Sequence, residues 1–271
     1  MSSKYFKHPL GTLAYRDTGD SEQAIVCLHS NSSSKDAFLC LEQNELLKRW
    51  RIIAVDLPGH GESSDSELGS EAYTIAGMAT MINCLIEQLD CNCHALVGWS
   101  LGGHIAMEQA AQNPSITKLV LSGTPPAGPG AEELTEAFIP SEHMALTGKE
   151  VFNEHEALIY AAHTIGKKYL EFPNLVEAAV RADGKCRATM TENWGKSTAG
   201  TNQARFVKNW NGELAILQGE EDSFVSKSYL DQLLIKNLWR DAVQYIPNAG
   251  HAPMLDTPQQ YCQLLADFLS E

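Results

Sequence analysis

Short apolar segments of strand length alternate along this chain with longer amphipathic segments of helical periodicity. The segments predicted as strands are residues 24–28, 52–55, 94–97, 118–121, 214–217 and 243–246. Those predicted as helices include residues 35–47, 74–89, 101–112 and 258–269. In residues 74–89, for example, apolar side chains recur every three or four positions, which predicts a helix with one buried face. Regular strand–helix alternation predicts an α/β fold whose parallel strands are joined by right-handed crossovers.

The alternation stops after Gly123. Residues 124–130 contain three prolines and two glycines, which disfavour regular structure. Residues 131–205 show only helix-like segments, such as 151–164 and 174–181, before the alternation resumes. We therefore predict a core made of residues 1–124 and 206–271, interrupted by a helical cap insertion at residues 125–205. An insertion at the carboxyl edge of a parallel sheet would cover the crevice in which such folds bind ligands.

The composition excludes several classes of partner. Lys and Arg total 20 against 34 Asp and Glu, a formal net charge of −14, so nucleic acid and membrane surfaces are predicted not to be partners. The N-terminus resembles no signal peptide, and no apolar run approaches the length of about 18 residues expected of a membrane-spanning helix. Seven irregularly spaced cysteines are typical of reduced thiols. These features predict a cytoplasmic protein.

The motif Gly98-Trp99-Ser100-Leu101-Gly102 lies directly between a predicted strand and a predicted helix. A Gly-x-Ser-x-Gly motif in this context predicts a sharp strand–turn–helix elbow that exposes the serine hydroxyl at a helix N-terminus. A serine that merely caps an ordinary helix would explain Ser100 but not both glycines. Ser100 is therefore the candidate nucleophile.

A serine hydroxyl needs an adjacent base to remove its proton, and His251 is the candidate. It lies in a loop between the last predicted strand and helix, flanked by Gly250 and, two residues on, Pro253. His104 lies on the helix after the elbow, where we expect it to face a neighbouring strand or solvent. His60 is expected to be a loop residue near the site rather than the base.

The third member of such a triad is a carboxylate that orients the histidine. The segment Glu220-Glu221-Asp222 follows a predicted strand and lies between the serine and the histidine in the chain. We assign Asp222 to this role, with Glu221 as the alternative. The oxyanion of the intermediate requires backbone N–H donors. One is expected from Leu101 and another from the turn after the first predicted strand, where the Asn31 side-chain amide would add a further donor.

Together these features resemble the α/β-hydrolase family over nearly the whole chain. The matching segments are residues 28–31, 56–63, 98–102, 219–222 and 250–251. The resemblance implies a mostly parallel eight-stranded sheet flanked by helices, an inserted helical cap and no cofactor. Ser30 departs from the family pattern, which usually has glycine there. A serine at the elbow argues against the haloalkane dehalogenases and epoxide hydrolases of the family, which use aspartate.

Within that family the chain looks most like the bacterial N-acyl-homoserine lactonases. The similarity rests on residues 29–34, 98–105, 123–126, 237–239 and 248–253. It implies that Tyr160, in the predicted cap, contacts the substrate together with Asn31. From composition alone, Tyr160 is at least as well explained as a buried core residue. The lactonases have a glutamate at the position of Asp222, so the resemblance supports that position but not the residue type.

Three functions are therefore in competition. The first is hydrolysis of the lactone ring of an N-acyl-homoserine lactone. The second is hydrolysis of small open-chain carboxylic esters, and the third is a hydrolase-like receptor that binds a signal. A metal site at Cys91, Cys93 and His94 has three close ligands but no distant fourth, so we predict thiols near a strand, and no metal.

Overall fold

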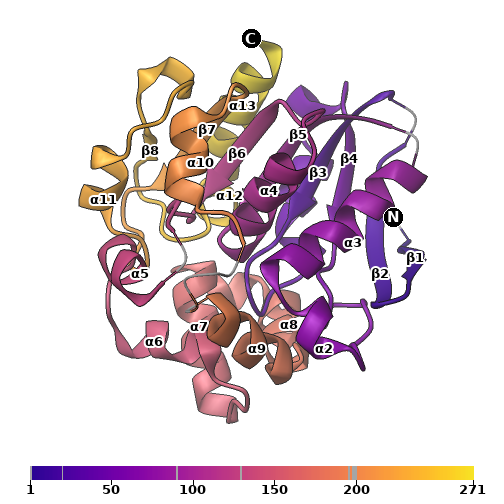
Figure 1. Cartoon of the computed structure of the whole chain (residues 1–271), viewed down its shortest axis with the longest axis vertical. Helices are drawn as coiled ribbons and strands as arrows, with labels where there is room; N and C mark the ends of the chain where they lie inside the picture. Colours follow the sequence, from indigo (N-terminus) through magenta and orange to yellow (C-terminus); the bar gives the residue numbers. More distant parts are fainter. Residues whose placement is uncertain (1, 20, 90, 129, 195, 197–199) are drawn as a thin grey trace.

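The computed structural model describes residues 2–19, 21–89, 91–128, 130–194, 196 and 200–271, so Pro129 of the predicted proline-rich loop lies outside it. Within these residues, eight strands form one sheet in the order β1-β2-β4-β3-β5-β6-β7-β8 (Figure 1). The strands are β1 (Lys4–His8), β2 (Gly11–Asp17), β3 (Gln23–Leu28), β4 (Arg51–Val55), β5 (Asn92–Trp99), β6 (Lys118–Ser122), β7 (Glu213–Gly219) and β8 (Gln244–Ile246). β1 and β2 pair antiparallel, as do β2 and β4, and the other pairs are parallel. The predicted mostly parallel α/β sheet is confirmed.

Helices cover both faces of this sheet, which explains why its central strands are almost uniformly apolar. In β3, Val26 and Leu28 pack in one core cluster with α3 (Ile75–Gln88) and α4 (Leu101–Gln112). Ile25 and Cys27 point to the other face, into a cluster that contains α13 (Pro258–Ser270). Side chains of one strand alternate between faces, so two covered faces require apolar residues at successive positions.

Two parts of the sequence-based prediction differ from the structure. The hairpin of β1 and β2 was not predicted, because β1 lies at the sheet edge and buries only Phe6 fully. Residues 35–47 form three short elements rather than one helix: η1 (Lys35–Phe38), α1 (Leu39–Glu42) and η2 (Glu45–Leu47). The Asn44 side chain accepts a hydrogen bond of 2.9 Å from the Leu46 amide, which starts a new helical turn and ends the previous one.

Between β6 and β7 the described residues form helical elements. They are α5 (Ala131–Ala137), α6 (Glu142–Ala145), η3 (Leu146–Gly148), α7 (Glu154–Ile165), η4 (Tyr169–Glu171), α8 (Pro173–Arg181), α9 (Gly184–Trp194) and α10 (Gln203–Asn209). α7 begins at a capping box in which Asn153 and Glu156 satisfy each other's amides. In Figure 1, α6, α7, α8 and α9 gather at one end of the sheet.

The remaining elements are short: α2 (Gly69–Ala72), α11 (Lys227–Gln232), η5 (Trp239–Asp241) and α12 (Pro253–Asp256). α12 directly follows the loop that carries His251. Among the described residues, no helix combines the length and the apolar character needed to cross a bilayer.

Candidate active site

Ser100 sits in a strained turn between β5 and α4. Its backbone has φ 54° and ψ −116°, a left-handed conformation that is costly for a residue with a side chain. The neighbouring glycines are required by close packing. A Cβ at Gly98 would lie 2.4 Å from Gly103 Cα, and one at Gly102 would lie 2.0 Å from the Leu28 carbonyl oxygen. The Gly-x-Ser-x-Gly pattern therefore lets β5 turn into a helix packed directly against β3.

His251 and Asp222 meet at the same edge of the sheet. His251 follows β8, Asp222 follows β7, and each side chain is 2% exposed. His251 Nδ1 lies 2.9 Å from Asp222 Oδ2 and 3.1 Å from Oδ1. Asp222 also accepts hydrogen bonds of 2.7 Å from the Phe224 amide and from Gln218 Nε2. Burial would raise the pKa of Asp222, but His251 and these donors outweigh it and lower the pKa. The carboxylate is thus held ionised next to the imidazole.

Glu221, the alternative acid, points away from this pair. Its carboxylate forms an ion pair with Lys167 at the surface, and its side chain is 43% exposed. Its backbone amide, by contrast, donates to the Ala249 carbonyl and helps to fix the loop. The structure therefore brings Asp222, and not Glu221, against His251.

The backbone around His251 is also fixed from the elbow. Trp99, the residue before Ser100, is fully buried, and its indole N–H donates a hydrogen bond of 2.8 Å to the His251 carbonyl. Within the described residues, His251 Nε2 has no hydrogen-bond partner, since the ring uses Nδ1 for Asp222. Among these residues, Nε2 is thus the ring nitrogen left without a protein partner, on a residue that borders the same cavity as Ser100.

Ser100 and His251 border one cavity of about 290 Å³, together with Asn31 and Tyr160. The rest of its wall is mostly apolar, and much of it comes from the helices between β6 and β7. Those apolar side chains include Leu134, Phe138, Met144, Met190 and Trp194. A mostly apolar cavity with a few polar groups is the usual form of a small-molecule site, and the volume of this cavity is near the lower end of the usual range, about 300–1,000 Å³.

Tyr160 borders this cavity and is also a core residue. Its side chain is 2% exposed, and its ring lies 5.5 Å from that of Phe152 and 6.4 Å from that of Phe224. Burial raises the pKa of its phenol, opposed in part by the charge of Arg187 and by the amide of Asn31. Tyr160 therefore remains a protonated hydroxyl near Asn31 in the neutral pH range.

His104 lies where the sequence did not predict it. We expected it to face a strand or solvent, but it is 2% exposed and borders the cavity. Its Nδ1 is 2.7 Å from Gln203 Oε1, and its ring centroid is 4.2 Å from that of Trp194. Burial lowers its pKa to about 4. His104 is one helical turn after Ser100 and so shares its face of α4, which the helical insertion covers.

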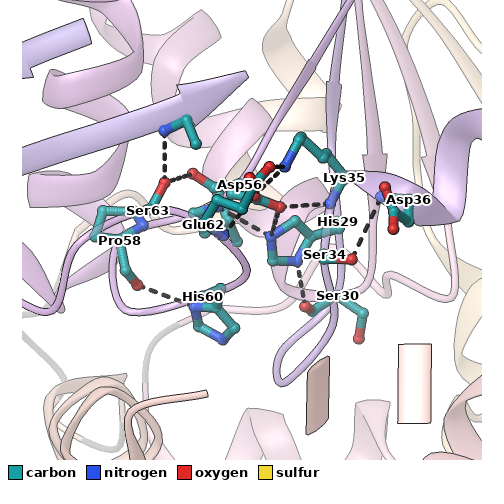
Figure 2. Close-up of polar contacts among 12 residues, drawn as sticks. His29, Ser30, Ser34, Lys35, Asp36, Asp56, Pro58, His60, Glu62 and Ser63 are labelled. Carbon is teal, nitrogen blue, oxygen red and sulfur yellow. Dashed lines mark hydrogen bonds and ion pairs between the residues drawn. The ribbon is translucent and has the colours of Figure 1, made fainter. Parts of the chain in front are cut away.

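Two buried histidines support the turn that carries Asn31. His60 Nε2 accepts a hydrogen bond of 3.0 Å from the Ser32 amide. Its Nδ1 donates to the Pro58 carbonyl at 2.9 Å (Figure 2). His29 accepts similarly from the Leu57 amide at 3.0 Å. Burial lowers the pKa of both rings to about 3, so both are neutral. The expectation that His60 lies near the site is met, in a supporting position.

An ion cluster fastens the other end of the same turn. The Lys35 ammonium lies 2.6 Å from both Asp56 and Glu62, and Asp56 also accepts the Lys35 amide at 2.7 Å (Figure 2). The Asp56 side chain is fully buried, which such a carboxylate tolerates only when it is paired and hydrogen-bonded. The turn between β3 and η1 is thus held rigidly against the loop after β4.

Sequence reasoning missed Gln218, Trp99 and His104 as parts of this site. Trp99 directly precedes Ser100 in the chain, and Gln218 lies four residues before Asp222, so their positions were a usable signal. Within the described part of the chain, no cluster of three or more His, Cys, Asp or Glu side chains could hold a metal ion.

Comparison with known proteins identifies relatives of this chain. The sequence profile of the alpha/beta hydrolase fold family matches residues 23–258. The solved structure of a serine-to-glycine mutant of the N-acyl homoserine lactonase AidH with N-hexanoyl homoserine lactone is 33% identical, with a TM-score of 0.94, over 99% of this chain and 97% of that one. The monoacylglycerol lipase ABHD6 of Bos taurus is 26% identical over all of this chain and 82% of its own length. The esterase RhEst1 of a Rhodococcus species shares the fold, at 21% identity and a TM-score of 0.78, over 100% of this chain and 99% of that one.

Proposed function

Since the chain belongs to the α/β-hydrolase fold family, we propose that it is a serine hydrolase that opens the lactone ring of N-acyl-homoserine lactones. The observation that carries this proposal is that Ser100 and His251 border one largely apolar cavity, with His251 paired to Asp222 behind it. The similarity to AidH over nearly the full length of both chains supports the choice of a lactone as substrate.

In the proposed reaction, His251 Nε2 accepts the Ser100 proton as Oγ attacks the lactone carbonyl. Asp222 holds the Nδ1–H and stabilises the imidazolium that forms. The Leu101 amide has no acceptor within its own helix, because the first amides of an α-helix lack one. That amide, the turn after β3 and the Asn31 side chain stabilise the oxyanion.

When the intermediate collapses, the ring C–O bond breaks and His251 protonates the departing alkoxide. The alcohol remains part of the acyl group, because both belonged to one ring. His251 then deprotonates a water molecule that attacks the acyl-enzyme, and the proton returns to Ser100 as the N-acyl-homoserine leaves. These reaction steps require no cofactor.

The cavity supports a substrate with one polar end and one apolar tail. Tyr160 and Asn31 border the same cavity as Ser100 and would bind the lactone and its amide, whereas Phe138, Met190 and Trp194 would contact the acyl chain. We also propose that residues 125–205 act as the cap that closes this cavity. The irregularly spaced cysteines and acidic composition support a cytoplasmic enzyme.

The decisive test compares two substrates with the same acyl amide. Purified protein is assayed with N-hexanoyl-homoserine lactone and with the methyl ester of N-hexanoyl-2-aminobutyrate, by chromatographic detection of the acids. A lactonase should show a higher kcat/KM for the lactone, because the ring must be recognised as such. Ser100→Ala should lower turnover of both by about 10³-fold or more, since triad members act as a unit.

The alternative function is hydrolysis of open-chain esters. The similarity to a monoacylglycerol lipase favours it, since the same triad and cavity would serve either ester. An equal or higher kcat/KM for the methyl ester would replace the lactonase proposal with this one. Release of a single equivalent of product without turnover would instead indicate a receptor.

A further inference from the structure

Arg187, on α9, carries a buried guanidinium that neither the triad nor the cavity wall uses. The residue is 3% exposed, and its plane lies over the Phe152 ring, with Cζ 3.9 Å from the ring centroid. Its donors reach the carbonyl oxygens of Lys149 at 2.7 Å, Glu150 at 3.0 Å and Ala182 at 3.4 Å. In the described part of the chain it has no carboxylate partner within ion-pair distance. Burying a charge without an ion pair costs free energy, so the guanidinium depends on its hydrogen bonds, of which one remains to be described.

That remaining contact crosses from α9 to the turn that carries Asn31. Arg187 Nη1 donates a hydrogen bond of 3.1 Å to the Ser32 hydroxyl, and Ser32 Oγ is 3.1 Å from Asn31 Oδ1. A guanidinium can only donate. Arg187 therefore occupies one lone pair of the Ser32 oxygen, and the Ser32 hydroxyl donates its single proton to Asn31 Oδ1.

This chain of donors fixes which way the Asn31 amide points. With Oδ1 turned to Ser32, the amide nitrogen lies on the opposite side and donates to the Thr147 carbonyl at 2.9 Å. The second N–H of Nδ2 is directed to the side of the Tyr160 hydroxyl, at the cavity that both residues border. A charged donor at the start of a hydrogen-bond chain also polarises the groups after it, which strengthens the final N–H.

The backbone of the same turn is held from the other side. Ser32 has a positive φ of 55°, and its amide is bound by His60, whose own ring is fixed by Pro58 (Figure 2). The core thus fixes the backbone at Ser32, whereas Arg187 fixes the side chain. Neither Arg187 nor Ser32 borders the cavity among its described lining residues, so neither is placed to touch substrate.

We propose that Arg187 is a positioning residue that, through the Ser32 hydroxyl, orients and polarises the Asn31 amide for the oxyanion of the transition state. The inference rests on the proposed serine-hydrolase function. It predicts an effect on kcat rather than on KM, because the oxyanion exists in the transition state and not in the bound substrate.

The test uses Ser32→Ala, Arg187→Gln and the double variant, with Arg181→Gln as a matched control. Arg181 also ties the helices between β6 and β7 to the core, through Asp65 and the Ser63 carbonyl, but it does not touch the turn of Asn31. For each protein, kcat and KM for N-hexanoyl-homoserine lactone are measured with the melting temperature. Inhibition by a trifluoromethyl ketone, which forms an oxyanion adduct with Ser100, provides the second readout.

Ser32→Ala and Arg187→Gln should each lower kcat by about 10-fold, with KM within about twofold, because a charge-assisted contact is lost. Both substitutions should weaken inhibition by the trifluoromethyl ketone by a similar factor. The double variant should lower kcat no further than the more impaired single variant does, because the two residues form one relay. Arg181→Gln should leave kcat and inhibitor affinity within about twofold of those of the unmodified protein.

Two results would overturn the relay. One is Ser32→Ala with unchanged kcat and unchanged inhibitor affinity, a comparison that stands even if Arg187→Gln does not fold. The other is an Arg187→Gln protein that melts lower but matches Arg181→Gln in kinetics, which would make Arg187 purely structural. Ser100→Ala distinguishes failure of the proposed function from failure of the relay. If that variant retains turnover, the proposed function fails, whereas the outcomes above test only the relay.

Discussion

Replacing Asp222 with asparagine should nearly abolish catalysis while preserving the shape of the site. Asp222 Oδ1 accepts the Phe224 amide at 2.7 Å, so an asparagine would place its oxygen there. Its NH₂ group would then occupy the place of Oδ2, 2.9 Å from His251 Nδ1 and 2.7 Å from Gln218 Nε2. The NH₂ group would therefore be a donor facing His251 Nδ1, whose N–H now donates to the Asp222 carboxylate.

The consequence is a change of histidine tautomer. An amide N–H that donates to Nδ1 forces the His251 proton onto Nε2, where it cannot accept the Ser100 proton. Gln218 cannot relieve its own clash without cost, because a flip of its amide breaks the 3.1 Å hydrogen bond that its Oε1 accepts from the Gly123 amide. The wrong tautomer should lower kcat by about 10⁴-fold, which is a loss of about 5 kcal/mol of transition-state stabilisation.

The assay measures kcat/KM and melting temperature for Asp222→Asn beside Glu221→Gln. Glu221 makes only an exposed ion pair with Lys167, a class of contact worth about 0–1 kcal/mol, so its variant should stay close to the unmodified enzyme. The reasoning fails if Asp222→Asn keeps a tenth of its activity with an unchanged melting temperature. It also fails if Glu221→Gln suffers the larger loss.

Other predictions concern the substrate, the metal requirement and acid stability. Tyr160→Phe should cost about 1–3 kcal/mol in kcat/KM on lactones and less on aryl esters, because a hydrogen bond to the substrate is lost; equal losses on both substrate classes would return Tyr160 to a purely structural role. Hydrolysis should survive prolonged treatment with a strong chelator, since Ser100 and His251 are the proposed nucleophile and base, and recovery of lost activity by added zinc would contradict this. His29 and His60 have folded-state pKa values of about 3, below that of an unfolded histidine, so the stability they contribute is complete above about pH 6.5 and is lost as the pH falls towards 3. Urea unfolding should show a loss of about 2 kcal/mol per histidine at pH 5, and His60→Gln, which keeps an acceptor for the Ser32 amide, should remove one such contribution; an unchanged pH profile would refute this.

The sequence revealed the elements whose local pattern and tertiary role agree. The strand at residues 94–97 and the helix at residues 101–112 were visible because burial on both sheet faces and the helical repeat both leave apolar signatures. The β1–β2 hairpin left almost none, because an edge strand is half exposed. His104 was misplaced because its environment depends on where the helical insertion lies. Arg187 carried no local signal at all, since its contacts with Ser32 and Lys149 are set only by tertiary packing.

The position of the helices between β6 and β7 also bears on how the chain folds. β6 and β7 are paired neighbours, yet residues 123–212 separate them, and closing a loop of about 90 residues costs about 1.6 kcal/mol more than closing one of about 15. During synthesis, β1 to β6 and the Ser100 elbow leave the ribosome well before Asp222 and His251, and N-terminal parts of a chain fold first. We therefore expect the nascent protein to present a formed nucleophile turn that has neither acid nor base. Hydrolytic competence would then arise only when β7 and β8 join the growing sheet.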